Sequence, residues 1–323
     1  IVVKREAMER AATEMQSGRS SSAAQSQRDA LDALERAREG TPRIVAGLVV
    51  VRDRQLEREV LLVDGDRLAM KTGIITLSDF RQKHLAAGGT GAPLAPYGDY
   101  LLFAEQTTDV WMLNIGGMAN LSYLPAGNHI NTMVCTDTGP GNALMDACVQ
   151  HNNPTQSYDA GGERAALGTI YEPLLQQLME DAGAKQAIPF STGPEYFNLP
   201  WLSKKIECSG MDKININDLL ATLNAFTADS IVRVMQQIKP MPTGKLYISG
   251  GGAHNHTLIN RMVAQLPNIT LTDTRSKGIP PDAKEAVLFA LLANETLAGS
   301  LQTWGEGAPN LPAVRMGKIS LPD

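Results

Sequence analysis

The sequence is poor in cysteine and lacks long apolar runs. Its 323 residues include three cysteines, Cys135, Cys148 and Cys208, whose spacing fits neither a metal site nor a disulfide framework. No apolar run approaches the ~18 residues that a membrane helix needs, and no signal peptide opens the sequence. These features predict a protein of the reducing cytoplasm that has no membrane partner.

An excess of positive charge is also absent. The net charge of −5 and the pI near 5.6 argue against a nucleic-acid partner, because nucleic-acid binders usually carry a basic patch. The sequence holds no GxxxxGK[ST] motif and no HRD or DFG set of the protein kinases. Phosphoryl transfer by this chain would therefore not use either of those frameworks.

The first part of the chain divides into a polar segment and a strand-bearing segment. Residues 1–43 read as polar helical pieces around a small-residue linker, which fits either solvated helices or partner-binding helices. Apolar β-branched runs then predict strands over 44–51, 60–63 and 74–77, and Asp64-Gly65-Asp66 predicts a turn. The stretch 86–96 is too rich in glycine and proline for a helix interior.

The second part alternates strands and helices. The pattern predicts a hairpin from strands 110–115 and 121–124, a strand over 132–136, a strand over 245–249, and helices over the segments 143–149, 171–179, 219–237, 256–264 and 286–297. This alternation indicates an α/β fold.

The stretch from Asp137 to Asn142 is the strongest single candidate for a catalytic corner. An apolar strand delivers an acid into a glycine-rich turn, and a helix follows, whose first amides would be free to bind an anion. The alternative is that Asp137 merely caps the helix and that the glycines only make a turn.

Two further glycine-rich corners follow strands, at 114–120 and 250–255. A glycine-bearing hairpin tip offers N–H groups to a phosphate, and a second strand-to-helix turn suits a nucleotide. Together the three corners resemble the second lobe of the actin-like ATPase and sugar-kinase superfamily, a two-lobed fold built on ribonuclease H-like units.

A closer resemblance rests on several long motifs in one order over roughly residues 60–323. They are SDFR, AAGGTGAPLAPYGDYLLF, NIGGMANLSYLP, DTGPGNALMDA, YDAGGERA, YISGGGAHN, GIPPDAKEAVLFALLANETLAG and LPAVRMGKISLP. This set resembles anhydro-N-acetylmuramic acid kinase. The resemblance implies an ATP- and Mg²⁺-dependent enzyme that hydrolytically opens the 1,6-anhydro ring and phosphorylates the sugar in cell-wall recycling. It also implies a possible homodimer.

The resemblance assigns roles to individual residues. Asp137 matches the general base, which takes a proton from the water that attacks the anomeric carbon. Glu285, Arg81 and the glycines Gly89 and Gly91 match sugar contacts. The fork of Arg81 suits the lactyl carboxylate. A first-turn glutamate and a surface salt bridge are the structural alternatives for Glu285 and Arg81.

The remaining positions that the resemblance assigns are on the nucleotide side. Gly116 and Gly117 match the phosphate hairpin, and His254 is expected to make only a structural hydrogen bond. The other nucleotide contacts are Gly139, Gly250, Gly251, Gly252 and Asn255.

The sequence departs from the family at its start. Residues 1–59 contain no GTSxDG hairpin, the segment 47–53 reads GLVVVRD where SHGQT is expected, and Thr90 replaces a glutamine. The expected organisation is thus a polar segment (1–43), the remainder of an incomplete first lobe (44–109) and a second lobe (110–323). A weak or inactive ligand-binding homologue, or a kinase for another anhydrosugar, remains an alternative to the active kinase.

Overall fold

The computed structural model describes residues 44–46, 64–88, 94–127, 132–181, 187–210, 213–279, 284–298 and 314–322. The chain divides into two compact units, each described by itself. Unit 1 comprises Ile1–Phe103 and Thr274–Asp323, and unit 2 comprises Ala104–Asp273. The predicted boundary at 109/110 lies close to the first of these divisions. The C-terminal residues, expected in the second lobe, instead group with unit 1.

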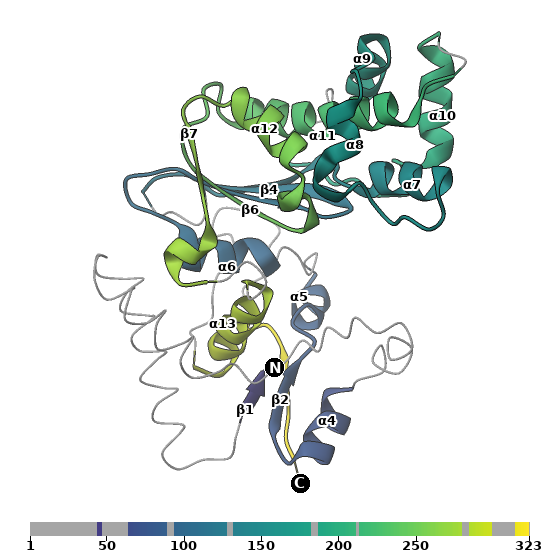
Figure 1. Cartoon of the computed structure of the whole chain (residues 1–323). Coiled ribbons are helices and arrows are strands. Elements are labelled where there is room, and N and C mark those ends of the chain that lie inside the picture. The colour runs from purple at the N-terminus through teal and green to yellow at the C-terminus, as the bar shows by residue number, and fades with distance from the viewer. Residues whose placement is uncertain are drawn as a thin grey trace. The chain divides into compact units, whose positions relative to one another are not determined.

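Unit 2 is built on a five-stranded mixed sheet (Figure 1). In the order β5-β4-β3-β6-β7, the first three strands are antiparallel and the last two continue parallel to β3. The strands are β3 (Val110–Ile115), β4 (Met118–Leu124), β5 (Val134–Pro140), β6 (Gly244–Ser249) and β7 (Ile269–Thr272). Antiparallel strands β3, β4 and β5, with β6 and β7 added in parallel on the other side of β3, form the ribonuclease H-like arrangement that the resemblance implied.

The helices of unit 2 follow the predicted pattern. They are α7 (Ala143–Asn152), α8 (Glu163–Leu167), α9 (Glu172–Asp181), α10 (Leu199–Cys208), α11 (Ile216–Ile238) and α12 (His256–Ala264). Asn215 begins α11, because its side chain accepts the backbone N–H of Asp218 at 3.0 Å. Figure 1 shows α8, α11 and α12 over one face of the sheet.

The core of unit 2 lies between the sheet and α11. Trp111, Leu113 and Ile115 alternate along β3 and are buried in one cluster with residues of α11, among them Phe226 and Ile231. The 23 residues of α11 carry apolar side chains at helical spacing, so one long helix covers the middle of the sheet.

Unit 1 contains a three-stranded sheet in the order β1-β2-β8. Its elements are β1 (Ile44–Ala46), α4 (Gly65–Thr72), β2 (Ile75–Ser78), α5 (Gln82–Ala86), α6 (Leu94–Phe103), α13 (Lys284–Ala298) and β8 (Lys318–Ser320). The antiparallel pairing of β2 with β8 explains why the C-terminal residues belong to this unit. The predicted turn at 64–66 is wrong: Asp64 accepts the backbone N–H of Asp66 at 2.7 Å and caps α4.

A buried ion pair joins α6 to α13. Lys284 Nζ lies 2.8 Å from Asp99 Oδ1, and the two side chains are 15% and 6% exposed. Burial raises the pKa of Asp99, although the neighbouring ammonium of Lys284 opposes this change. A Cβ at Gly98 would lie 2.3 Å from Leu288 Cδ1, so glycine lets the two helices approach closely.

Some predicted elements lie outside the described residues. These are the polar segment 1–43, the strand over 60–63 and the part of the first strand beyond Ala46. Among the residues that are described, no helix combines the length and the apolar character that crossing a membrane requires.

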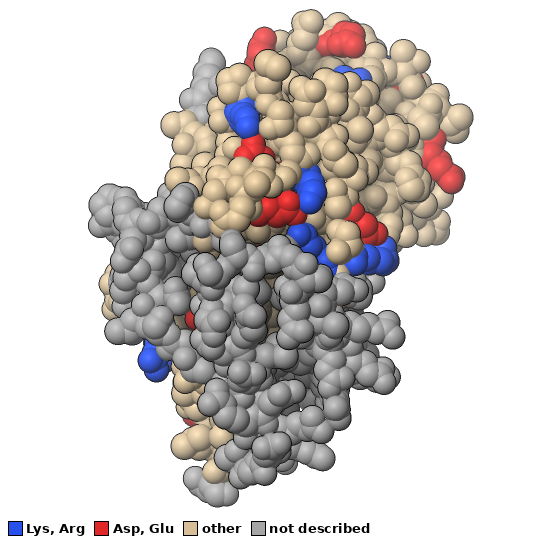
Figure 2. Space-filling view, turned by 90° about the vertical axis from the view of Figure 1, so that its left-hand side faces the viewer, with Lys and Arg blue, Asp and Glu red and all other residues tan. Residues whose placement is uncertain are grey.

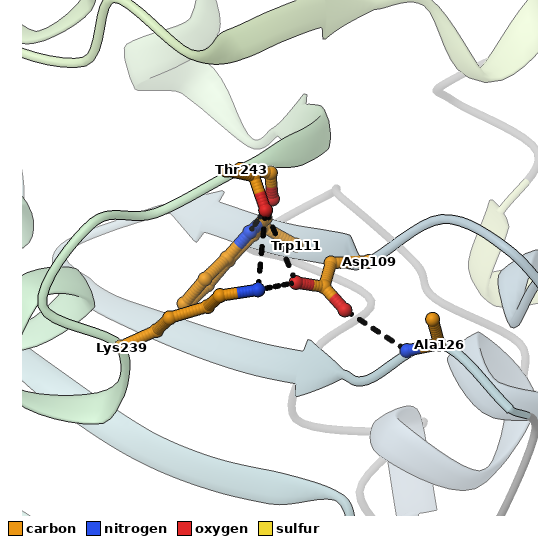
Figure 3. Close-up of polar contacts among 5 residues, drawn as sticks. All are labelled: Asp109, Trp111, Ala126, Lys239 and Thr243. Carbon is orange, nitrogen blue, oxygen red and sulfur yellow. Dashed lines mark hydrogen bonds and ion pairs between the residues drawn. The ribbon is translucent and has the colours of Figure 1, made fainter.

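A polar cluster around Asp109 fixes the first end of β3 (Figure 3). Asp109 Oδ2 pairs with Lys239, which follows α11, and Oδ1 accepts the backbone N–H of Ala126 at 2.9 Å. Lys239 also donates to Thr243 Oγ1 at 3.1 Å, and Trp111 Nε1 donates to the Thr243 carbonyl at 2.9 Å. The cluster thus ties β3 to the segments that follow β4 and α11.

The Asp109→Ala substitution should destabilise unit 2. Burial raises the pKa of Asp109, but the hydrogen bonds from Lys239 and Ala126 lower it by more, so the folded-state pKa lies below the usual value. The stabilisation that Asp109 contributes to the folded state is therefore present above its unfolded pKa of about 4, and it is lost as pH falls through the folded pKa. We expect a loss of about 2–3 kcal/mol in the free energy of unfolding at pH 7.

Urea denaturation at pH 7 and pH 3 measures this effect, with Asp66→Ala as the control. Asp66 pairs with Lys318 on the surface, so its loss should hardly change stability. An equal deficit for Asp109→Ala at both pH values would contradict the proposed charge interaction.

Candidate functional site

The first glycine-rich corner is the hairpin between β3 and β4. Gly116 and Gly117 connect the strands, and the Gly116 N–H donates to the Met118 carbonyl at 3.1 Å. This confirms the predicted strand–turn–strand hairpin.

The hairpin tip is bonded to the start of α7 through three consecutive amides. The N–H groups of Gly141 and Ala143 donate to the Gly117 carbonyl at 2.9 and 3.1 Å, and that of Asn142 donates to the Gly116 carbonyl at 2.8 Å. The expectation of free amides at the start of the helix is therefore wrong for Ala143, whose N–H is satisfied by a hairpin carbonyl, as are those of Gly141 and Asn142 before it.

The same hydrogen bonds determine the direction in which the hairpin's own backbone N–H group at Gly117 points. Since a peptide unit is planar and trans, the Gly117 N–H points opposite to the Gly116 carbonyl. That carbonyl faces the start of α7, so the Gly117 N–H faces away from the helix. Gly117 is exposed, and its amide is thus a candidate anion donor of this corner.

Asp137 lies within β5 and not at its end, because the strand continues to Pro140. The register with β4 shifts here: Asn120 is opposite Asp137 and Ala119 is opposite Gly139. Thr138 is the extra residue of this β-bulge, and Gly139 adopts φ 129°, which favours glycine. Bulges of this kind change the direction in which nearby side chains point.

The carboxylate of Asp137 is held by a distant segment. Its Oδ2 accepts the backbone N–H of Thr192 at 2.7 Å and the hydroxyl of Ser191 at 3.1 Å. Asn142, not Asp137, occupies the N-cap position of α7, and its side chain makes no cap bond. The alternative that Asp137 only caps the helix is therefore wrong.

The glycine turn after β6 packs against the hairpin end of β3. A Cβ at Gly250 would lie 2.6 Å from the Ile115 carbonyl oxygen, and one at Gly252 would lie 2.3 Å from Ile115 Cγ2. At Gly251 the nearest atom to such a Cβ is Asn142 Nδ2, at 3.7 Å. The three glycine-rich corners thus converge at one end of the sheet, where Gly251 is exposed and a Cβ on it would make only an ordinary contact.

Asn255 follows this turn and has a structural function. It is buried, its Oδ1 caps α12 by accepting the Leu258 N–H at 3.1 Å, and it also accepts from Asn224 Nδ2 at 3.1 Å. Gly162, of the YDAGGERA motif, packs against it: a Cβ there would lie 2.1 Å from Asn255 Oδ1. His254 is exposed, and the described residues offer its side chain no hydrogen bond.

The residues predicted to contact the sugar belong to unit 1. Arg81 is exposed at the start of α5, and no ion pair of its side chain is found among the described residues. Gly89 and Gly91 lie outside the described residues. Glu285 belongs to α13, and its side chain is not among those described.

The sequence did not reveal the side chains and amides that hold Asp137 and the turn after it by hydrogen bonds. Ser191 and Thr192 lie far from Asp137 in sequence, and no motif connects them to it. Thr227 of α11 donates to the carbonyls of Pro140 and Gly141 at 3.1 and 3.2 Å. A buried hydroxyl inside an apolar helix was the available signal for Thr227.

Asp146, in the first turn of α7, has a perturbed acidity. Burial raises its pKa from 3.8 to about 6. Elsewhere on unit 2, opposite charges lie beside each other, as in the pairs Lys245–Glu105 and Arg261–Asp229. Figure 2 shows basic and acidic side chains interspersed on one face.

The substitution Asp146→Asn should stabilise the protein at pH 7.5. The raised folded pKa means that Asp146 favours folding below its unfolded pKa of about 4, and this benefit is lost as pH rises through about 6. Because the side chain is partly exposed, we expect a gain of only about 1 kcal/mol. Urea unfolding should show this gain at pH 7.5 and almost none at pH 4.5. Asp229→Asn, which breaks an ion pair, should give no gain, and a pH-independent gain for Asp146→Asn would refute the explanation.

The chain is similar in sequence to a group of bacterial kinases. A protein called anhydro-N-acetylmuramic acid kinase in Pseudoalteromonas atlantica is 45% identical over 80% of this chain and 65% of its own length. Those of Coxiella burnetii and Caldanaerobacter subterraneus are 41% and 38% identical. The chain spans about 65% of the length of these curated relatives.

Solved structures give weaker similarities. An activator of 2-hydroxyisocaproyl-CoA dehydratase from Clostridium difficile, with bound ADPNP, superposes with a TM-score of 0.35 at 12% identity, over 62% of this chain and 65% of that one. A ROK family glucokinase from Streptomyces griseus, in complex with glucose and AMPPNP, gives a TM-score of 0.29 at 13% identity, over 70% of this chain and 71% of that one.

The family model of anhydro-N-acetylmuramic acid kinase matches residues 28–317, which is most of the sequence. This range includes the hairpin, the bulged strand with Asp137 and the glycine turn after β6. The chain therefore belongs to the anhydro-N-acetylmuramic acid kinase family.

Proposed function

We propose that the protein is an ATP-dependent kinase that hydrolytically opens 1,6-anhydro-N-acetylmuramic acid and yields N-acetylmuramic acid 6-phosphate, in peptidoglycan recycling in the cytoplasm. The observation that carries the proposal is the convergence of three glycine-rich corners beside β5, which bears Asp137. Membership of the kinase family supports it. A homodimer is part of the same expectation.

The corners of unit 2 are suited to a nucleotide. Gly251 is exposed, and a Cβ on it would meet only Asn142 Nδ2, at 3.7 Å. The exposed Gly117 amide faces away from α7. We propose that Gly116 and Gly117 contact phosphate and that Gly250, Gly251 and Gly252 form the adenosine side. Gly139 and Asn255 are both buried, so we propose that they support the nucleotide-binding turns from the protein interior.

Magnesium fits this arrangement without a dedicated protein cage. Mg²⁺ keeps several waters and binds chiefly to the substrate phosphates, so it needs one or two carboxylates at most. The part of the chain that is described contains no cluster of three ligand side chains, and Asp137 and Asp146 are the carboxylates on β5 and α7. Bound to ATP, the ion would neutralise charge that develops on the phosphates.

The proposed chemistry uses Asp137 as a general base. Its Oδ2 is engaged by Thr192 and Ser191, so Oδ1 is the oxygen that takes a proton from water. The water oxygen bonds to the anomeric carbon, and the bond from that carbon to the 6-oxygen breaks. The released 6-oxygen bonds to the γ-phosphorus as ADP leaves, which balances the reaction.

Arg81 is proposed to contact the sugar. Arg81 carries an exposed guanidinium whose planar fork suits the lactyl carboxylate. Gly89, Gly91 and Glu285 complete the proposed contacts. The lactyl group distinguishes this substrate from other anhydrosugars, so Arg81 would decide between them.

A binding protein without turnover is the second candidate. It is favoured by the sequence of residues 1–59, which contains no GTSxDG hairpin. Loss of preorganised donors around a phosphoryl group typically costs orders of magnitude in rate. ATP binding without sugar-dependent ADP release would identify this case.

The Asp137→Asn substitution should abolish most turnover. Removing a general base typically costs 10²–10⁴-fold in rate, while the amide still accepts the Thr192 N–H, so folding should persist. Sugar-dependent ADP release with Mg²⁺ present measures the effect. Asp229→Asn, in the same unit, is the control and should retain wild-type activity. Full activity of the Asp137 variant would exclude its role as the base.

Two neighbouring glycines should respond differently to alanine. The methyl of Gly251→Ala would meet only Asn142 Nδ2, at an ordinary contact distance, so thermal stability should not change. Because the methyl would occupy the proposed nucleotide space, it should weaken ATP binding about tenfold, which is ~1.4 kcal/mol. The methyl of Gly252→Ala collides with Ile115 and should lower the melting temperature. Calorimetric ATP titration and thermal unfolding measure the two effects, and unaltered ATP affinity in Gly251→Ala would refute this nucleotide site.

A further inference from the structure

The segment Phe190–Thr192 is fixed along the edge of β5 by a buried hydroxyl. Thr136 Oγ1 accepts the backbone N–H of Phe190 at 3.0 Å and lies 3.2 Å from the Phe190 carbonyl, to which it can donate. The backbone N–H of Asp137 donates to that same carbonyl at 3.0 Å. Thr136 is only 6% exposed, so water does not readily replace it as a partner.

The far end of this segment is anchored as well. Phe197 is 4% exposed in the core of unit 2, and its ring meets that of Trp201 edge-on at 5.1 Å. The N–H groups of Tyr196 and Phe197 donate to the Gly193 carbonyl at 3.1 and 3.2 Å. Ser191 and Thr192 are therefore held between two fixed points.

Both donors from the segment reach the same oxygen of Asp137. Thr192 donates its N–H at 2.7 Å and Ser191 its hydroxyl at 3.1 Å, and both bonds end on Oδ2. Two donors on one oxygen fix the rotation of a carboxylate and leave its other oxygen to face the reacting water. The orientation of the base thus depends on Ser191 and Thr192, which reach it from a distant part of the chain.

We propose that Thr136 and Ser191 are positioning residues for the Asp137 carboxylate, with Thr136 acting through the Phe190–Thr192 segment. This inference rests on the proposed role of Asp137 as the general base. Thr136 aligns the segment, Ser191 and the Thr192 amide hold Oδ2, and Oδ1 remains to accept the proton.

The key variant is Thr136→Val, and Thr222→Val is its matched control. Thr222, on α11, is also buried and makes the same pair of bonds: it accepts the Tyr171 N–H at 3.0 Å and donates to the Asp218 carbonyl at 2.7 Å. Both substitutions leave a partly buried N–H unpaired, so both should lower thermal stability similarly. We expect only Thr136→Val to lower kcat, by about 10- to 100-fold, with both KM values within about twofold.

Ser191 supplies a second, milder test. Ser191→Ala removes one donor to the ionised carboxylate, which favours the protonated form. The acid limb of the kcat–pH profile should therefore move to higher pH, and Ser191→Thr, which keeps the hydroxyl, should restore it. A purely structural role would lower kcat equally at all pH values.

A measurement independent of turnover separates this inference from the proposed function. In the full-length protein, the Thr192 amide proton should shift with pH as the carboxylate that it contacts ionises, and this response should vanish in Asp137→Asn. Thr136→Val should abolish or weaken the response, and Thr222→Val should leave it intact. The amide signal is followed by ¹H–¹⁵N NMR.

The outcomes can be told apart. A wild-type Thr192 response that Thr136→Val does not alter overturns the positioning role, as does unchanged kcat in an active Thr136→Val protein. An intact and Thr136-dependent response in a protein without turnover refutes the kinase function but supports the positioning of Asp137.

Discussion

The close approach of two backbones at Gly141 governs the end of unit 2 where the glycine-rich corners meet. A Cβ at this position would lie 2.3 Å from the Gly116 carbonyl oxygen, so only glycine allows the hairpin to reach the start of α7. Once there, the hairpin satisfies three amides of the corner. The direction of the remaining hairpin amide and the position of the bulged strand both follow from this contact.

Helix α11 supports the same end of the sheet from beneath. Thr227 holds the carbonyls of the corner before α7, and Asn224, one turn earlier, holds the cap of α12. The cluster around Asp109 lies at the opposite end of β3 and also includes Lys239, which follows α11. One helix therefore connects a polar anchor at one end of the sheet with the glycine-rich corners at the other.

The sequence predicted local elements well and tertiary partners poorly. The hairpin, α9, α11 and α12 follow from periodicity and caps, because these signals are local. The turn predicted at 64–66 was wrong because Asp64 can either begin a turn or cap a helix, and tertiary context decides. The Ser191 and Thr192 contacts to Asp137 were unpredictable, since no local pattern encodes a hydrogen bond between segments so far apart in the chain.

The bulge at Thr138 makes the length of β5 as important as its composition. Side chains alternate between the two faces of a strand, and the extra residue of the bulge interrupts that alternation while the pairs on both sides of it stay in register. A sequence that lost only Thr138 would keep Asp137 opposite Asn120 and every glycine of the motif, yet it would remove the bulge that redirects the backbone beside the acid. In comparing members of this family, a one-residue gap at this point therefore marks a changed strand beside the acid even where every residue of the motif is kept.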